Sequence, residues 1–224
     1  MRYIIALFGS ACLLCAGLAA CSGGSSSLPN PFSQPSPSPT PAIPTPPPAP
    51  TPTPISLALG AVVGTKVFPA GDTASGGQGA PVDGMACENT ASTYHIHAHV
   101  SLFHNGSQVA IPLAIGLMSP VFSMGGNFAD AGGCFYHLHG HDNSGIVHIE
   151  NPTAFTATLG EYFDIWGEPL TASNIAGFTG PTLFYVGTSL FNGDPRTIVL
   201  TNHEQVTLEV GGPYVFPPFY TWPY

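Results

Sequence analysis

The sequence predicts an α+β fold in which an antiparallel-rich sheet carries one helix on its apolar face. Segments that alternate apolar and polar residues with a period of two, typical of half-buried strands, recur between residues 94 and 210. Residues 158–166 instead place apolar residues at helical spacing. A β-grasp-like topology is one form of this arrangement, and an all-β cupredoxin-like sandwich is the alternative.

Residues 1–20 have the features of a lipoprotein signal peptide. Arg2 precedes a short apolar run at residues 3–14, which is too short to span a membrane as a helix. The sequence LAAC at positions 18–21 resembles the lipobox of bacterial lipoproteins. This resemblance implies that Cys21 is acylated and anchors the mature protein to a bacterial membrane outside the cytoplasm, in the periplasm or at the cell surface. An ordinary signal peptide with an incidental cysteine is the alternative.

Residues 21–54 are predicted to be a lipid-anchored, disordered linker rich in serine and proline. Thirteen of the 27 residues from Leu28 to Pro54 are proline, and proline lacks the backbone N–H that helices and sheets require. An extended polyproline II chain rises about 3.1 Å per residue and would reach up to about 80 Å. We favour a spacer over a partner-binding motif because no basic residue accompanies the prolines.

The charge balance excludes several kinds of partner. The whole chain contains Lys+Arg 3 and Asp+Glu 12, a formal net charge of −9. Proteins that bind nucleic acids or anionic membrane surfaces need clustered lysine and arginine, which this chain lacks. We therefore expect no nucleic-acid partner and membrane contact only through the lipid anchor.

Residues 55–212 are predicted to form a histidine-rich metal-binding domain. Eight of the nine histidines lie between His95 and His148. On a strand, His95, His97 and His99 share one face, and the residues that alternate with them form an apolar face directed at the core. We therefore expect these histidines to point away from the core and to lie on an open surface.

Turn signals fold each histidine segment into a hairpin. Asn105-Gly106 predicts a type I′ turn, and residues 142–145 are a cluster of turn-forming residues. The first turn predicts the pairs Leu102 with Val109 and Val100 with Ile111. The second predicts the pairs His141 with Ile146, His139 with His148, and His137 with Glu150. Partners across a hairpin lie about 5 Å apart at Cβ, which is a chelating distance.

Together the two hairpins offer seven imidazoles and one carboxylate as candidate metal ligands. They are His95, His97, His99, His137, His139, His141, His148 and Glu150. Nitrogen donors with one carboxylate suit transition metals, and we expect copper or zinc; calcium and magnesium prefer oxygen ligands. His104 and His203 are interpreted as ordinary surface residues. The favoured function is metal buffering, sensing or delivery.

The alternative function is a mononuclear or dinuclear metalloenzyme, a hydrolase or an oxidoreductase, that uses the same histidine face with Glu150 or Asp142 as the base. A binding protein is favoured over an enzyme because the sequence contains no separate nucleophile or cofactor motif.

The two remaining cysteines of the domain, Cys87 and Cys134, are expected to form a disulfide, because leftover thiols usually pair in an oxidising compartment. Metal ligation by their thiolates is the alternative. A bridge between them would bring the two histidine segments together.

The rest of the domain is predicted to be scaffold. Residues 158–161 read as a helix-capping box, and Pro169 is expected to end the helix. Residues 182–187, 196–200 and 206–211 read as strands. The uncharged tail at residues 213–224 carries six aromatic residues and four prolines. We expect it to strap the domain, with a docking tail as the alternative.

Three motifs carry a resemblance to a known family. "YHIHAHVSLFHNG", "CFYHLHGHDNSGIVHIE" and "TLGEYFDIWG", together spanning about residues 87–211, are similar to an uncharacterised family of extracellular or membrane-anchored bacterial and archaeal proteins. That resemblance implies no established activity. The second motif is also similar to the H-x-H strand of multicopper oxidases, whose other motifs are absent from this sequence.

Overall fold

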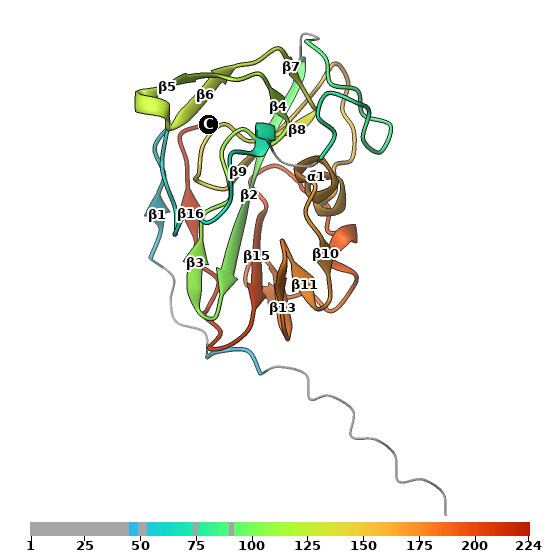
Figure 1. Cartoon of the computed structure of the whole chain (residues 1–224). Helices are drawn as coiled ribbons and strands as arrows, with labels where there is room; N and C mark the ends of the chain where they lie inside the picture. The colour runs from blue at the N-terminus through green and yellow to red at the C-terminus, as the bar shows by residue number, and fades with distance from the viewer. Residues whose placement is uncertain (1–44, 49–52, 74–75, 90–91) are drawn as a thin grey trace, which may run out of the picture. The chain divides into compact units, whose positions relative to one another are not determined.

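A seven-stranded sheet forms the centre of the domain (Figure 1). The computed structural model describes residues 45–48, 53–73, 76–89 and 92–224; the predicted signal peptide, Cys21 and most of the predicted linker lie outside the described residues. Along the sheet the strands are β14 Ser189–Leu190, β13 Thr182–Val186, β15 Gln205–Val210, β2 Tyr94–His104, β9 Ile146–Asn151 and β8 Leu138–His139, with β3 Ser107–Val109 also pairing with β2.

The pairing in this sheet is antiparallel except between β15 and β2, which run parallel. The one α-helix of the described residues, α1 Leu159–Trp166, lies against the sheet's apolar face. The predicted α+β class with an antiparallel-rich sheet and one packed helix is thus confirmed. No helix among the described residues is long and apolar enough to cross a bilayer.

Short strand pairs surround the central sheet. They are β1 Ile55–Ser56 with β16 Tyr220–Thr221, β4 Leu117–Met118 with β7 Cys134–Phe135, β5 Val121–Ser123 with β6 Phe128–Ala131, and the meander β10 Leu170–Thr171, β11 Asn174–Ile175 and β12 Phe178–Thr179. Short 3-10 turns occupy Gly71–Thr73, Met124–Gly126 and Pro195–Thr197.

The core lies between α1 and the apolar face of the sheet. Val100 and Leu102 on β2 are buried there, as are Val147 and Ile149 on β9 and Leu208 on β15. Their counterparts on the helix are Leu159, Tyr162, Phe163 and Trp166. Because side chains alternate along β2, burying this row directs His95, His97 and His99 to the opposite, polar face.

The first predicted hairpin is largely confirmed. Asn105 and Gly106 both have positive φ, 51° and 74°, as a type I′ turn requires. Leu102 pairs with Val109, but the predicted pair of Val100 with Ile111 is wrong. β3 ends at Val109, and the Val100 amide instead donates to the Gly145 carbonyl at 2.8 Å.

The second hairpin is shorter than predicted. His139 pairs with His148, and the Glu150 amide donates to the His137 carbonyl, so two of the three predicted pairs are confirmed. The pair of His141 with Ile146 is wrong, because the His141 carbonyl accepts the Ala129 amide and joins the segment to β6.

The helix and the strand after it correct two further expectations. The capping box is present, but α1 ends at Trp166 because Gly167 adopts a left-handed conformation, φ 83°, before Pro169 is reached. The predicted strand at residues 196–200 is wrong. Asp194 caps the 3-10 turn that replaces it, and Val199 makes only an isolated bridge.

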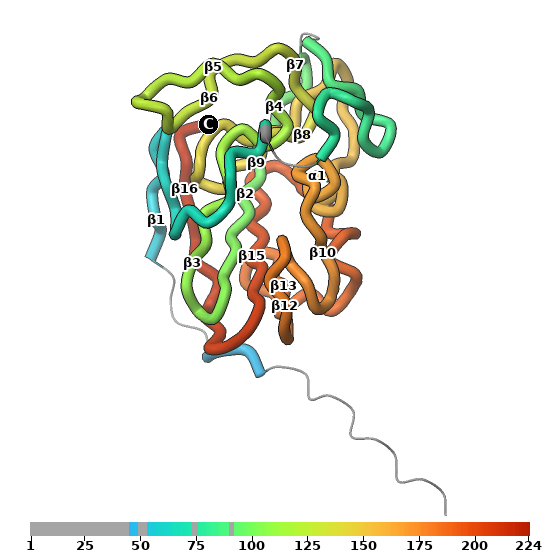
Figure 2. The backbone as a smooth tube through the Cα atoms, viewed as in Figure 1, coloured from blue at the N-terminus to red at the C-terminus, as the bar shows by residue number. Residues whose placement is uncertain are grey.

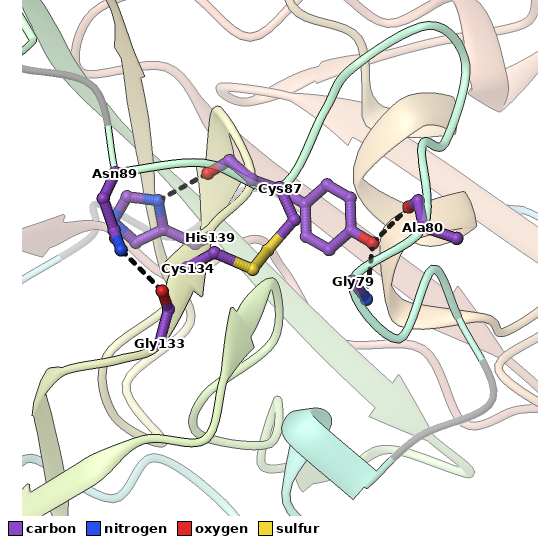
Figure 3. Close-up of a disulfide and its surroundings, with 8 residues drawn as sticks. Gly79, Ala80, Cys87, Asn89, Gly133, Cys134 and His139 are labelled. Carbon is purple, nitrogen blue, oxygen red and sulfur yellow. Dashed lines mark hydrogen bonds between the residues drawn. A yellow bond between two sulfur atoms is a disulfide. The ribbon is translucent and has the colours of Figure 1, made fainter.

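A disulfide joins Cys87 to Cys134, as predicted. Figure 3 shows it beside His139, between the segment that precedes β2 and the strand β7. Backbone hydrogen bonds in both directions between Glu88 and Phe135 continue the connection. The second histidine segment is therefore fastened covalently to the segment that enters the first.

Replacing both cysteines, Cys87→Ser/Cys134→Ser, is expected to lower the free energy of unfolding by about 4 kcal/mol, because a cross-link over a separation of 47 residues restricts the unfolded chain. Denaturant unfolding of the oxidised wild type and the double variant measures the difference, and reduced wild type should match the variant. Equal unfolding midpoints with equal m-values would contradict the expectation.

Candidate metal centre

The polar face of the central sheet brings imidazoles from two adjacent strands into register. His95 on β2 lies opposite Glu150 on β9, and His97 lies opposite His148. His139 on β8 flanks His148 from the other side. His148 therefore stands at the centre of a row that crosses three strands.

Two overlapping groups of these side chains could hold a metal ion. Within each group the donor atoms lie within 4.8 Å of one another. The first group is His139, His141, His148 and Glu150, and the second is His95, His97 and His148. Six of the eight predicted ligands thus belong to these two groups, which share His148.

The distances around Glu150 match those of a coordination sphere. Its Oε1 atom lies 3.0 Å from His95 Nε2 and 3.5 Å from His148 Nδ1. It lies 3.6 Å from His139 Nε2, and His95 Nε2 is 3.1 Å from His148 Nδ1. Ligand atoms bound at about 2.0–2.1 Å to a tetrahedral ion lie about 3.3 Å apart. The observed separations bracket that value.

Backbone carbonyls orient two of the rings. His139 Nδ1 donates to the Tyr136 carbonyl at 2.9 Å, and His141 Nδ1 donates to the Ala129 carbonyl at 2.5 Å. Since a carbonyl only accepts, each Nδ1 carries the proton and each Nε2 keeps its lone pair. Metal-binding histidines in proteins commonly have this arrangement.

His97 supplies independent evidence that the residues fit an ion. Its Nε2 atom is buried and has no hydrogen-bond partner among the described residues. A buried polar atom without a partner is costly, and a bound ion would satisfy it. The donor set, the fixed tautomers and this atom agree with a transition metal.

Two predicted ligands lie outside both groups. His99 Nε2 donates to the Ser144 carbonyl at 2.8 Å, Ser101 Oγ lies 3.5 Å from its Nδ1, and its ring stacks on Tyr220. His137 Nε2 lies 3.1 Å from Glu88 Oε1. Both rings are therefore engaged by protein groups.

Three other side chains that the sequence singled out interact with neighbouring residues. His104 stacks on Phe178, and the exposed His203 stacks on Trp222. Asp142, the alternative base, accepts the Gly60 amide through Oδ2 and the Ser144 amide through Oδ1. These hydrogen bonds occupy both carboxylate oxygens in holding the turn.

The C-terminal segment covers much of the polar face, so the expected open histidine surface is wrong. In Figure 2 this red segment passes β1 as β16, and β1 pairs with it in parallel. The Tyr224 ring lies 4.6 Å from that of His97 and 5.6 Å from that of His148, centroid to centroid. Tyr224 is a site residue that the sequence did not identify, although the aromatic residues of the tail indicated a segment that packs on the domain.

Burial under this cover lowers the histidine pKa values. Burial, with a smaller contribution from the neighbouring His95, lowers the pKa of His97 to about 4. Burial also lowers the pKa of His139 and of His148, and nearby histidines add to the effect. His97, His139 and His148 are therefore neutral near pH 7, which is the protonation state that binds metal ions.

The side chains of the cluster determine the chemistry that it can perform. Comparison with protein-family models, curated proteins and solved structures finds no match for this chain. Neutral imidazoles with one carboxylate can hold an ion, polarise a ligand bound to it, and supply Glu150 as a proton acceptor.

Metal-free protein is expected to lose stability as the pH falls from about 6.5 towards 4. Burial lowers the pKa of His99 from 6.5 to about 4. The unfolded chain therefore binds the proton first, and the stabilisation present above pH 6.5 is lost on acidification. Denaturant unfolding in chelator across this range measures the loss.

The variant His99→Gln should flatten that pH profile by up to roughly 3 kcal/mol, the free energy equivalent to the His99 shift. His203→Gln, at an exposed histidine, is the matched control and should keep the wild-type profile. Parallel profiles for wild type and His99→Gln would contradict the assignment.

Proposed function

We propose that this chain is an extracytoplasmic lipoprotein that binds a copper or zinc ion for buffering, sensing or delivery of the metal. The ligands are His139, His141, His148 and Glu150, with His95 and His97 available beside them. The observation that carries the proposal is that Glu150 Oε1 lies 3.5 Å from His148 Nδ1 and 3.6 Å from His139 Nε2, with His95 Nε2 a further 3.0 Å neighbour of the same oxygen.

The donor chemistry supports the choice of metal. Imidazole nitrogen is a good ligand for both zinc and copper(II), and one carboxylate oxygen completes a four-coordinate set for either ion. Where the two ions compete at a site of this kind, copper(II) binds more tightly. Calcium and magnesium would need oxygen donors that the cluster does not provide.

The N-terminal sequence supports the location. The LAAC motif ending at Cys21 and the proline-rich stretch that follows suit an acylated protein held away from a membrane. The Cys87–Cys134 disulfide is consistent with an oxidising compartment. In such a compartment metal ions reach a protein directly from the medium.

A metalloenzyme is the second candidate, and one observation favours it. A cavity of about 230 Å³ lies beside the cluster, and both His139 and Glu150 line it. An ion held by these two side chains would have one side facing space that a substrate can enter.

Replacing His148 is expected to abolish high-affinity metal binding, because this side chain belongs to both donor groups. Purified wild type should carry close to one equivalent of copper or zinc, measured by elemental analysis. In calorimetric titration His148→Gln should bind at least about a hundredfold more weakly, since even a residue that only supports a ligand is worth about 10–100-fold.

His99→Gln is the matched control, because His99 is an equally buried strand histidine whose nitrogens are engaged by Ser144 and Ser101. It should bind metal as wild type does. A wild type without metal, or equal losses in the two variants, would refute the proposed site.

The lipid anchor has its own test. Wild type expressed with its full leader should partition into the detergent phase of a Triton X-114 extract, and Cys21→Ser should move to the aqueous phase, because one acylated cysteine carries the anchor. Cys12→Ser, a change within the leader, should partition as wild type. Aqueous partitioning of the wild type would refute the anchor while leaving the metal site untouched.

A further inference from the structure

The cavity of about 230 Å³ shares two residues with the first donor group. His139 and Glu150 line it, and Glu88 and Asn89 form another part of its wall. Figure 3 shows Asn89 near His139, and the Cys87–Cys134 bridge joins the segment that carries Asn89 to the strand β7. The cavity therefore borders two of the proposed ligands, and Tyr224 is not among its lining residues.

Its walls are held in place before any ligand arrives. The disulfide fixes the chain next to Glu88, and the Glu88 and Phe135 backbones exchange hydrogen bonds of 2.9 and 3.0 Å. Asn89 Nδ2 donates to the Gly133 carbonyl, and Ser92 Oγ donates to the Tyr94 carbonyl at 2.6 Å. Preorganised walls reduce the entropy that a ligand loses on binding.

The charges of the cavity select against anions. Glu88 and Glu150 both line it, and none of the described lining residues is lysine or arginine. Glu150 already offsets part of the charge of a divalent ion, and Glu88 adds a second carboxylate beside His137. An uncharged molecule enters this environment without opposing either carboxylate.

The size and surface of the cavity further limit the class of ligand that it can bind. A cavity of about 150 Å³ holds benzene, whereas sites for drug-sized ligands begin at about 300 Å³. Phe135 and Pro152 provide apolar surface, while Glu88 and Asn151 provide oxygen acceptors. A small molecule with one apolar side and O–H or N–H groups fits.

We propose that this cavity binds a small uncharged organic molecule in direct contact with the metal ion at His139 and Glu150. The molecule gives a lone pair to the ion and donates hydrogen bonds to acceptors on the wall. This inference rests on the proposed function. It implies that the bound ion keeps one coordination position that an outside molecule can occupy, rather than being enclosed by protein ligands alone.

Imidazole is a suitable probe, because it is uncharged at pH 8.5 and has one lone pair and one N–H group. Added to copper(II)-loaded wild type, it should shift the visible and electron paramagnetic resonance spectra in a saturable manner while copper stays bound through desalting. Asn89→Trp adds a bulky side chain at a residue that lines the cavity and should weaken imidazole binding at least tenfold. Asn192→Trp, an exposed asparagine outside the cavity, should bind imidazole as wild type does.

A second variant tests the charge argument without adding bulk. Glu88→Gln keeps a hydrogen-bond acceptor near His137 and removes one negative charge. It should strengthen binding of azide, an anionic probe, by about fivefold, as expected for losing one nearby like charge in a partly hydrated site. Imidazole binding should change less than twofold.

The outcomes separate the cavity from the metal site. A wild type that takes up a full equivalent of copper but shows no spectral response to imidazole would overturn the cavity proposal alone. Equal imidazole affinity in Asn89→Trp and Asn192→Trp, or equal effects of Glu88→Gln on azide and imidazole, would also overturn it. A wild type that takes up no copper would overturn both proposals together.

Discussion

The alternation of side chains along β2 is the constraint on which both the core and the metal cluster depend. Val100 and Leu102 are buried against α1, and the same pleat turns His95 and His97 to the other face. A shift of one residue in the pairing with β9 would exchange the two faces of the strand. It would bury imidazoles in the apolar core and scatter the donor atoms. The apolar side therefore specifies the register, and the register positions the histidines.

The C-terminal segment that covers the polar face meets a second requirement of metal binding, which is that the histidines beneath it are neutral. Tyr224 lies over His97 and His148, and burial lowers the pKa values of both histidines. A buried histidine pair that stays neutral costs no stability near neutral pH. In acid the folded state becomes less stable, because the unfolded chain binds protons that the buried pair does not. The carbonyls of Tyr136 and Ala129 then decide which nitrogen of each flanking ring keeps its lone pair. Cover and carbonyls together prepare the cluster for an ion.

Local signals in the sequence were sufficient for much of the fold and part of the site. The Asn105-Gly106 turn, the Thr158 capping box and the pairing of His139 with His148 are decided within short stretches of chain, and each was predicted correctly. Contacts between distant segments were not predictable in this way. The parallel pairing of β15 with β2, the attachment of His141 to Ala129 and the position of Tyr224 all depend on tertiary packing. The alternating histidines indicated which residues could bind metal, but only the packing shows which face is closed.

The surroundings of the cluster differ from one ligand to another, and this difference bears on what a bound ion would do. Tyr224 contacts His97 and His148, whereas His139 and Glu150 border a cavity with polar walls. A protein that only stores metal gains from enclosing the ion with its own ligands, whereas delivery and catalysis both need a position that an outside molecule can occupy. A molecule that enters this cavity meets the carboxylate of Glu88, and the wall of the cavity therefore becomes a determinant of what the site accepts.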